Sequence, residues 1–388
     1  MTDTWRQVAL GDVAAEVTVG YVGPMASEYV SDGVPFLRSL NVREHRIDLA
    51  DVRYITPTFN ERLAKSLLRP GDVVTVRTGK PGTTAVIPES LPIANCSDVV
   101  ITRPGGDLDS RWLSYYINGV ADGFVASRLV GAVQQHFNVG SAKEMQLLLP
   151  PIEEQRAIAA TLGALDDRIE SNLRAIDLAE TLGDSLFAQA ASATTALADA
   201  AHLTMGSSPP GSSYNEDGIG RPFYQGVRDF GRRFPGLRVW TTQPVRLAEA
   251  NDTLVSVRAP VGDLNRASVV CCIGRGVASV RSEMASTIYY ALRAASDLWA
   301  PFQQEGTVFG AINRADLAAA KLPWPDSLVA PDLEMRLSAL DERIASLSRE
   351  SDQLKGLRDA LLPELLSGRI RVPVGADEYE TPDELEHA

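Results

Sequence analysis

The 388-residue sequence has few cysteines and no long apolar run. Its three cysteines, Cys96, Cys271 and Cys272, are too few for a disulfide framework and lack the paired spacing of a zinc site. No apolar stretch approaches the roughly 20 residues that cross a bilayer, and the N-terminus lacks a basic segment followed by an apolar one. We therefore expect a cytoplasmic protein that is neither exported nor membrane-spanning.

Signatures of catalysis are also missing. The sequence contains no Walker phosphate loop, no dinucleotide-binding glycine motif and no G-x-S-x-G elbow, and its four histidines form no H-E-x-x-H pair. Neither Pro-Pro pair lies in the Asn/Asp-Pro-Pro-aromatic tetrapeptide that an adenine-N6 methyltransferase needs. Asp72 and Lys80 could be placed in a nuclease metal site, but a turn-start aspartate and a loop lysine are the better interpretation. The sequence predicts a binding protein with no catalytic residue and no metal.

An internal repeat organises the chain. LGALDDRI begins at Leu162 and LSALDERI begins at Leu337, an offset of 175 residues that also relates Asn138 to Asn313. The repeat predicts a globular unit followed by a long helix, twice over.

Both long helices carry the heptad spacing of a coiled coil. Apolar residues alternate by four and three from Ile158 to Leu186, and the same phase runs from Leu333 to Leu361. Asn172, Ser351 and Arg358 interrupt this seam, and such polar residues commonly fix register. A single amphipathic helix would more often pack on its own domain, but two copies in the same phase favour an antiparallel pair.

Short alternating strands separated by glycine and proline turns, together with helical patterns, make each globular unit a mixed α/β domain. The predicted fold class is α+β: two mixed α/β domains separated by two long antiparallel helices that form a coiled coil, with an internal pseudo-twofold repeat. The predicted boundaries are 1–151 for the first domain, 152–190 for the central helix, 191–326 for the second domain, 327–372 for the C-terminal helix and 373–388 for an acidic tail.

The net charge of −13 argues at first against a nucleic-acid partner. The charge is unevenly distributed, however. Residues 221–281 hold ten arginines, no lysine and four acids, whereas the first helix and the tail are acidic. Arginine reads guanine and clamps phosphate, but a GC-rich genome would also favour arginine over lysine. The composition therefore leaves nucleic-acid recognition open.

Two helical segments, LLLPPIEEQRAIAATLGALDDRIESN (147–172) and LKGLRDALLPELLSGRIRV (354–372), resemble the specificity subunit of type I restriction-modification systems. MGSSPPGSSYNEDGIGRPFYQG (205–226) and VSVRAPVGD (255–263) are similar to that family as well. The resemblance covers nearly the whole chain apart from the acidic tail.

The resemblance implies a non-catalytic, DNA-binding subunit of a phage-defence system. Two target recognition domains would each read one half of a bipartite double-stranded DNA sequence, and the helices would set the spacing and dock two methyltransferase subunits. Those subunits would bind S-adenosylmethionine and methylate adenine N6, and restriction subunits using ATP and Mg would cut. The alternatives are a free-standing DNA-modifying enzyme of a related defence system and a coiled-coil scaffold that does not bind DNA.

Candidate DNA-binding residues follow strands and lie in polar or basic loops, where side chains can enter a groove. They are Arg38, Ser39, Asn41, Arg77, Thr78, Lys80, Gln134, Gln135 and His136 in the first unit, and Ser208, Tyr214, Gln225, Arg228, Arg258 and Phe309 in the second. Each has a structural alternative, such as a strand-end ion pair for Arg77 or a loop anchor for Tyr214. Candidate partner-binding residues on the first helix are Glu153, Gln155, Arg168 and Glu170, which could equally form a solvated face.

Overall fold

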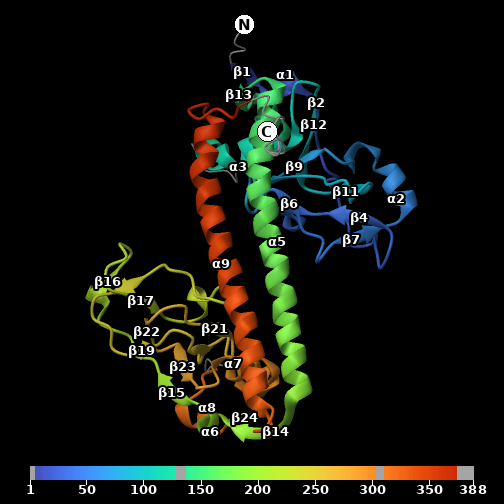
Figure 1. Cartoon of the computed structure of the whole chain (residues 1–388). Helices are drawn as coiled ribbons and strands as arrows, with labels where there is room; N and C mark the ends of the chain where they lie inside the picture. The colour runs from blue at the N-terminus through green and yellow to red at the C-terminus, as the bar shows by residue number, and fades with distance from the viewer. Residues whose placement is uncertain (1–4, 128–136, 303–309, 374–388) are drawn as a thin grey trace, which may run out of the picture. The chain divides into compact units, whose positions relative to one another are not determined.

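The computed structural model describes residues 5–127, 137–302 and 310–373, and it divides into two compact units. Unit 1 is formed by Met1–Ile169 with Asp352–Ala388, and unit 2 by Glu170–Ser351. Two long helices, α5 (Ile152–Ala190) and α9 (Ala330–Leu366), each contribute one part to unit 1 and one part to unit 2 (Figure 1).

Unit 1 contains three main sheets. A two-stranded sheet pairs β1 (Arg6–Ala9) with β13 (Gln146–Leu149); a four-stranded sheet has the order β10-β9-β12-β2; and a five-stranded sheet has the order β3-β7-β4-β11-β8. The strands of the larger sheets are β2 (Ala14–Val19), β3 (Tyr29–Val30), β4 (Val34–Leu37), β7 (Arg53–Ile55), β8 (Leu67–Leu68), β9 (Val73–Val76), β10 (Thr84–Val86), β11 (Ala94–Cys96) and β12 (Val99–Pro104). A small hairpin joins β5 (Val42–Arg43) to β6 (Arg46–Ile47).

The helices of unit 1 connect and cover these sheets. They are α1 (Leu10–Val13), α2 (Pro57–Arg62), α3 (Ser110–Ser127) and α4 (Val139–Glu144), with 3-10 turns η1 (Ser39–Asn41) and η2 (Ala64–Ser66). Trp112 and Leu113 of α3 are fully buried in a core that also takes Leu162 from α5 and Leu365 from α9. The domain therefore closes its core with both long helices.

Unit 2 repeats the three main sheets of unit 1, and its described strands include no counterpart of the β5–β6 hairpin. Its sheets have the orders β14-β24, β21-β20-β23-β15 and β16-β18-β17-β22-β19. The strands are β14 (Ala191–Ala196), β15 (His202–Met205), β16 (Tyr214–Asn215), β17 (Arg221–Tyr224), β18 (Trp240–Thr241), β19 (Leu247–Ala248), β20 (Thr253–Ser256), β21 (Leu264–Arg266), β22 (Cys271–Ile273), β23 (Val277–Arg281) and β24 (Lys321–Pro325). The helical elements are α6 (Leu197–Ala200), η3 (Gly211–Ser213), η4 (Val227–Asp229), α7 (Ala285–Ala294), η5 (Ser296–Phe302) and α8 (Arg314–Ala319).

The predicted α+β fold with duplicated domains is confirmed. Each five-stranded sheet also contains one parallel strand pair, which was not predicted from the sequence. β4 pairs in parallel with β11, and β17 pairs in parallel with β22. In the antiparallel four-stranded sheets, the central strands β9 and β20 are buried at every position. Each parallel pair ends in a loop that enters the candidate site described below.

Within each unit the long helices run antiparallel. In unit 2, Ile176 of α5 packs with Ile344 and Leu347 of α9, and in unit 1 Asp166 of α5 forms an ion pair with Arg358 of α9. One interruption of the apolar seam, Arg358, is therefore satisfied by an acid on the facing helix. Helices of 39 and 37 residues are about 58 and 55 Å long at ~1.5 Å per residue.

One aspartate of the repeated LDxRI segment ties each globular domain to its helices. Asp166 of α5 and Asp341 of α9 are related by the 175-residue offset. In unit 1, Asp166 accepts a hydrogen bond of 2.5 Å from the Tyr115 hydroxyl of α3. In unit 2, Asp341 pairs with two arginines of the globular domain, Arg233 and Arg266.

The unit 2 cluster around Asp341 is almost completely buried. The Arg233 side chain is only 2% exposed, and its guanidinium lies 3.4 Å from the centroid of the Tyr289 ring. Glu180 of α5 lies 3.8 Å from the same guanidinium, and burial raises the pKa of this carboxyl. Because an isolated buried charge is costly, each member of the cluster depends on the others.

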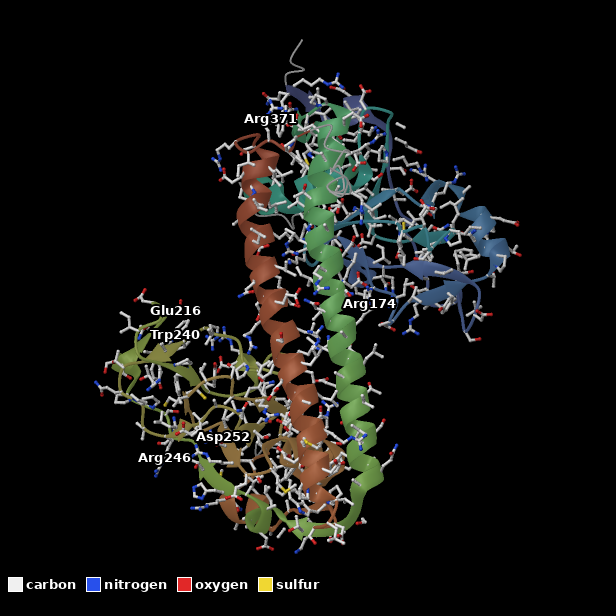
Figure 2. All side chains as sticks on the ribbon, viewed as in Figure 1. Arg174, Glu216, Trp240, Arg246, Asp252 and Arg371 are labelled. Atoms are coloured by element: carbon white, nitrogen blue, oxygen red, sulfur yellow. The ribbon has the colours of Figure 1, made fainter. Side chains whose placement is uncertain are left out.

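Replacing Asp341 with alanine should strongly destabilise unit 2. The substitution leaves the buried Arg233 and Arg266 without their shared carboxylate, and breaking a buried pair in this way costs about 3–5 kcal/mol. We expect that loss in the free energy of unfolding measured by urea denaturation of the full chain. The control is Arg174→Ala, which removes an exposed i,i+4 pair with Glu170 and should cost no more than about 0.5 kcal/mol (Figure 2). Equal effects of the two substitutions would contradict this account of the cluster.

Candidate nucleic-acid interface

Each unit has a polar cavity at the same place in its topology. In both units the cavity is lined by the loop that follows the first parallel strand, β4 or β17, and by the hairpin turn between β9 and β10 or between β20 and β21. The cavity of unit 2 has a volume of about 570 Å³ and that of unit 1 about 600 Å³. The two cavities share these two loops; the unit 1 cavity is also lined by the β5–β6 hairpin and by Arg358 of α9, and the unit 2 cavity by the β22–β23 turn.

The unit 2 cavity, here called the arginine pocket, brings together four of the residues predicted from the sequence. Ser208, Gln225, Arg228 and Arg258 all line it. The sequence analysis did not single out Arg275, which lines the same pocket from the turn between β22 and β23. The sequence signal that could have identified Arg275 is its position in the glycine turn directly after β22, the second strand of the parallel pair.

Ion pairing divides the ten arginines of residues 221–281 into two groups. Five pair with carboxylates: Arg232 with Asp177, Arg233 and Arg266 with Asp341, Arg238 with Asp229, and Arg281 with Asp252. Arg221, Arg228, Arg246, Arg258 and Arg275 pair with no acid among the residues that the structure describes. Three of these five exposed arginines line the arginine pocket. Five of the ten arginines therefore stabilise the fold through ion pairs, and three of the other five line one cavity.

Buried polar side chains hold the loops of the arginine pocket. Asp229, at the end of η4, accepts a hydrogen bond of 2.6 Å from the backbone N–H of Gln225 and is only 4% exposed. In the β20–β21 hairpin, the Ser256 hydroxyl donates to the backbone oxygen of Pro260 at 2.7 Å, and the Asp263 N–H donates to the Ser256 oxygen at 2.8 Å. These bonds fix the backbone on both sides of Arg228 and Arg258 while the two guanidiniums stay exposed.

Two other predictions for unit 2 have different outcomes. Tyr214 does not line the arginine pocket: its hydroxyl donates to the backbone oxygen of Pro209 at 3.0 Å, and its ring packs on Phe223 with centroids 4.9 Å apart. It is a loop anchor, the structural alternative considered for it. Phe309 lies outside the described residues, as do Gln134, Gln135 and His136 of the first unit.

The unit 1 cavity receives Ser39, Thr78 and Lys80 of the predicted residues. Its polar groups are more heavily paired than those of the arginine pocket. Thr78 donates to Asp98 at 2.5 Å, and Lys80 forms an exposed ion pair of 2.5 Å with Glu44. The lining also holds Arg43, Arg46 and Arg358, so four cationic side chains face one acid, Glu44, and the first cavity is predominantly basic as well.

Three predicted residues of unit 1 serve the fold. Asn41 is 1% exposed, accepts the Arg38 N–H at 3.0 Å and donates to the Asp48 backbone at 2.9 Å, so the prediction that Asn41 meets DNA is wrong. The Arg38 guanidinium donates to Asp51 at 3.0 Å, and Arg77 forms a 3.3 Å ion pair with Asp98. Neither Arg38 nor Arg77 lines the unit 1 cavity.

The predicted docking residues on α5 do not form one face. Gln155 is fully buried and hydrogen-bonds Asp109 and the backbone oxygens of two further residues, so it is unavailable to a partner and that prediction is wrong. Glu153 and Glu170 are exposed and pair with arginines on their own helix, and Arg168 is exposed as well. The sequence could not show that Gln155 faces inward, because its partners come from a distant loop.

Among the described residues, no group of three or more His, Cys, Asp and Glu side chains could hold a metal ion. All three cysteines are buried as free thiols, and burial raises the pKa of Cys271 to about 12. In the part of the chain that the structure covers, no helix is long and apolar enough to cross a membrane.

Comparison with known proteins places this geometry in a family context. No protein-family model matches the chain. The chain is 26% identical, over 95% of its length and 94% of the relative's, to a protein of Methanocaldococcus jannaschii assigned as the type I restriction enzyme MjaX specificity subunit. It shares the fold of the S subunit of a type I restriction-modification system from M. genitalium, with a TM-score of 0.64, 14% identity and coverage of 94% of this chain and 96% of that one.

A further similar structure is the HsdS subunit from Thermoanaerobacter tengcongensis, with 25% identity, coverage of 95% and 98%, and a TM-score of 0.37. The fold defines a protein with two copies of one α+β domain, each packed on the two long helices. The chain is similar to a type I restriction enzyme specificity subunit over nearly its whole length, and the resemblance found in the sequence is confirmed.

His45 provides a test of the unit 1 architecture. It occupies the β5–β6 turn with φ of 63°, and its ring packs on Tyr115 with centroids 4.3 Å apart. Burial lowers its pKa below 6.5; Arg358 adds to this effect, and Asp166 and Glu44 oppose it. A histidine with a lowered folded-state pKa stabilises the fold above about pH 6.5, and that contribution is lost as the pH falls through the folded pKa.

Asparagine tolerates the positive φ of position 45. We therefore expect the His45→Asn variant to lose less stability than the unaltered chain when the pH is lowered from 7 to 5. The measurement is the free energy of unfolding of both proteins across that range. His202→Asn, the same substitution at an exposed strand position of unit 2, is the matched control. Parallel slopes for the His45→Asn variant and the unaltered chain would contradict the assignment.

Proposed function

We propose that this protein is the DNA sequence-specificity subunit of a type I restriction-modification complex, with one half of a bipartite DNA target read by each unit. The observation that carries the proposal is the pair of equivalent cavities, of which the second is lined by three unpaired arginines. DNA affinity comes largely from cationic side chains that neutralise phosphates, and free guanidiniums are suited to that task. Similarity to a specificity subunit over 95% of the chain supports the same conclusion.

In this proposal residues 1–151 and 191–326 are the target recognition domains, and residues 152–190 and 327–372 are the spacer, followed by the acidic tail 373–388. The subunit itself is cytoplasmic, non-catalytic and binds no cofactor. Two methyltransferase subunits would dock on the helices and use S-adenosylmethionine to methylate adenine N6. Restriction subunits would supply ATP- and Mg-dependent cleavage.

Partner docking is proposed for the exposed faces of the helix pair. Glu153, Arg168 and Glu170 remain candidates on α5, whereas buried Gln155 does not. Acidic faces suit a protein partner better than phosphate, since they would repel a DNA backbone.

DNA binding by the purified full chain should be steeply salt-dependent. Affinity for duplex DNA should fall with salt at a slope of about −0.9 per phosphate contacted. Arg258→Ala should weaken binding, whereas the unpaired, exposed Arg246, which lies outside the arginine pocket, supplies the control Arg246→Ala. A chain that binds no DNA at low salt would favour the scaffold alternative, and adenine methylation by the chain alone would favour the enzyme alternative.

Exchange of residues 200–325 for those of another specificity subunit should change one half of the recognised sequence. The other half should persist, because each unit has its own core and its own cavity. The recognised sequence is obtained by sequencing duplexes that the chain selects from a random pool. A change in both halves would contradict separate reading.

Lengthening the helices should lengthen the gap between the half-sites. One heptad inserted after Ile169 in α5 and one after Ser351 in α9 add about 10.5 Å to the helix pair and keep the seam in phase. The expected result is a gap longer by about 3 base pairs, with unchanged half-sites, in the same selection. An unchanged gap would show that the helices do not set the spacing.

A further inference from the structure

We propose that the arginine pocket makes unit 2 a reader of guanine, with Arg258 in bidentate contact with guanine O6 and N7 in the major groove. Arg228 and Arg275 line the same pocket and take part in the same readout. The inference rests on the proposed function, because it names the base that one of the two domains selects. It is carried by a residue-by-residue comparison of the two cavities.

The hairpin turns establish the first equivalence. In unit 1, Gly82 donates its backbone N–H to the backbone oxygen of Val76 at 3.1 Å. In unit 2, Gly262 donates in the same way to Ser256 at 2.9 Å. The residue two positions after the acceptor is Thr78 in unit 1 and Arg258 in unit 2. The same turn therefore presents a short hydroxyl in one domain and a guanidinium in the other.

The loop after the parallel strand gives the second equivalence. Asn41 in unit 1 and Asp229 in unit 2 end the 3-10 turns η1 and η4, and each accepts the N–H of the residue that follows the strand. The side chain just before this capping residue is Leu40 in unit 1 and Arg228 in unit 2.

The turn after the second parallel strand gives the third. Ser97 donates its backbone N–H to the backbone oxygen of Leu37 at the end of β4, at 3.0 Å. Gly274 donates in the same way to Tyr224 at the end of β17, at 2.8 Å. The next residue is Asp98 in unit 1 and Arg275 in unit 2, which is a reversal of charge. At all three equivalent positions the second domain carries arginine where the first does not.

This difference points to base readout. The phosphate backbone is chemically the same in both halves of any target, so a phosphate contact can be made by the same side chain in both domains. Side chains that differ at equivalent positions on the same scaffold are the ones that can distinguish two half-sites. The three arginines also pair with no acid in the described parts of the chain, and they stand on backbone held by buried hydrogen bonds.

Guanine is the base that matches these side chains. The planar guanidinium fork fits the O6 and N7 acceptors of guanine, whereas a carboxylate is needed to accept from cytosine N4. The lining of the arginine pocket contains no aspartate or glutamate. Gln225, exposed in the same lining, suits an adjacent adenine.

The test uses the full chain and duplexes selected from a random pool. The unaltered chain should select guanine at one or more positions of one half-site. The Arg258→Ala variant should lose the preference for guanine at one of these positions. Its preferences at the remaining positions and in the other half-site should be unchanged. Replacing that guanine with 7-deazaguanine, which lacks N7, should weaken the unaltered chain at least about 5-fold and leave the Arg258→Ala variant unaffected. Arg258→Lys keeps the charge but not the fork and should also lose the preference.

The control is Arg246→Ala, an exposed and unpaired arginine at the outer edge of the same unit, which should leave all preferences unchanged (Figure 2). If Arg258→Ala weakens all duplexes alike and lowers the salt slope by about 1, Arg258 contacts phosphate and the inference is overturned. If the unaltered chain selects a bipartite sequence whose guanines do not respond to Arg258, Arg228 or Arg275 substitution, the inference fails while the proposed function stands. If the unaltered chain selects no sequence, both fail.

Discussion

An aspartate at the same place in each repeat, half-buried in unit 1 and buried in unit 2, is the constraint on which the two domains depend. Asp166 and Asp341 are related by the internal offset, and each projects from a long helix toward the globular domain of its unit. In unit 1 the partners are the Tyr115 hydroxyl and Arg358 of α9, and in unit 2 they are Arg233 and Arg266. A buried carboxylate requires such partners, because desolvation without them costs several kcal/mol. Each domain is therefore held on its helices by directional polar contacts as well as by apolar packing, and these polar contacts fix the orientation of the domain's core on its helices.

The same requirement explains the uneven distribution of charge. Arginines 232, 233, 238, 266 and 281 of the second unit neutralise carboxylates of their own unit, so they contribute nothing to an external field. The arginines left over are exposed, and three of them meet in one cavity. The net charge of the whole chain averages over these groups and says little about any one surface.

Local patterns were predictable from the sequence, and side-chain partnerships were not. The heptad phase and the duplicated LDxRI segment predicted both long helices and their antiparallel pairing, because helical periodicity is a property of neighbouring residues. Ser208, Gln225, Arg228 and Arg258, chosen from the sequence as candidate DNA-binding residues, line one cavity, and their contact with DNA stays a prediction. Gln155 and Asn41 were misjudged because each is buried by hydrogen bonds to segments that lie elsewhere in the chain or fold back on it. Polarity alone cannot distinguish a residue that caps a turn from one that faces a ligand.

The duplicated fold separates the residues that maintain structure from those free to differ. Asp229 and Asn41 perform the same capping task in the two units, and both are buried. The residues that immediately precede them, Arg228 and Leu40, are exposed and differ completely in chemistry. Since an exposed, unpaired side chain contributes little to folding, such positions can change with a cost that is usually within about 0.5 kcal/mol. A scaffold of this kind can acquire a new recognition surface at a few loop positions while its helix aspartate, its caps and its helical seam stay the same.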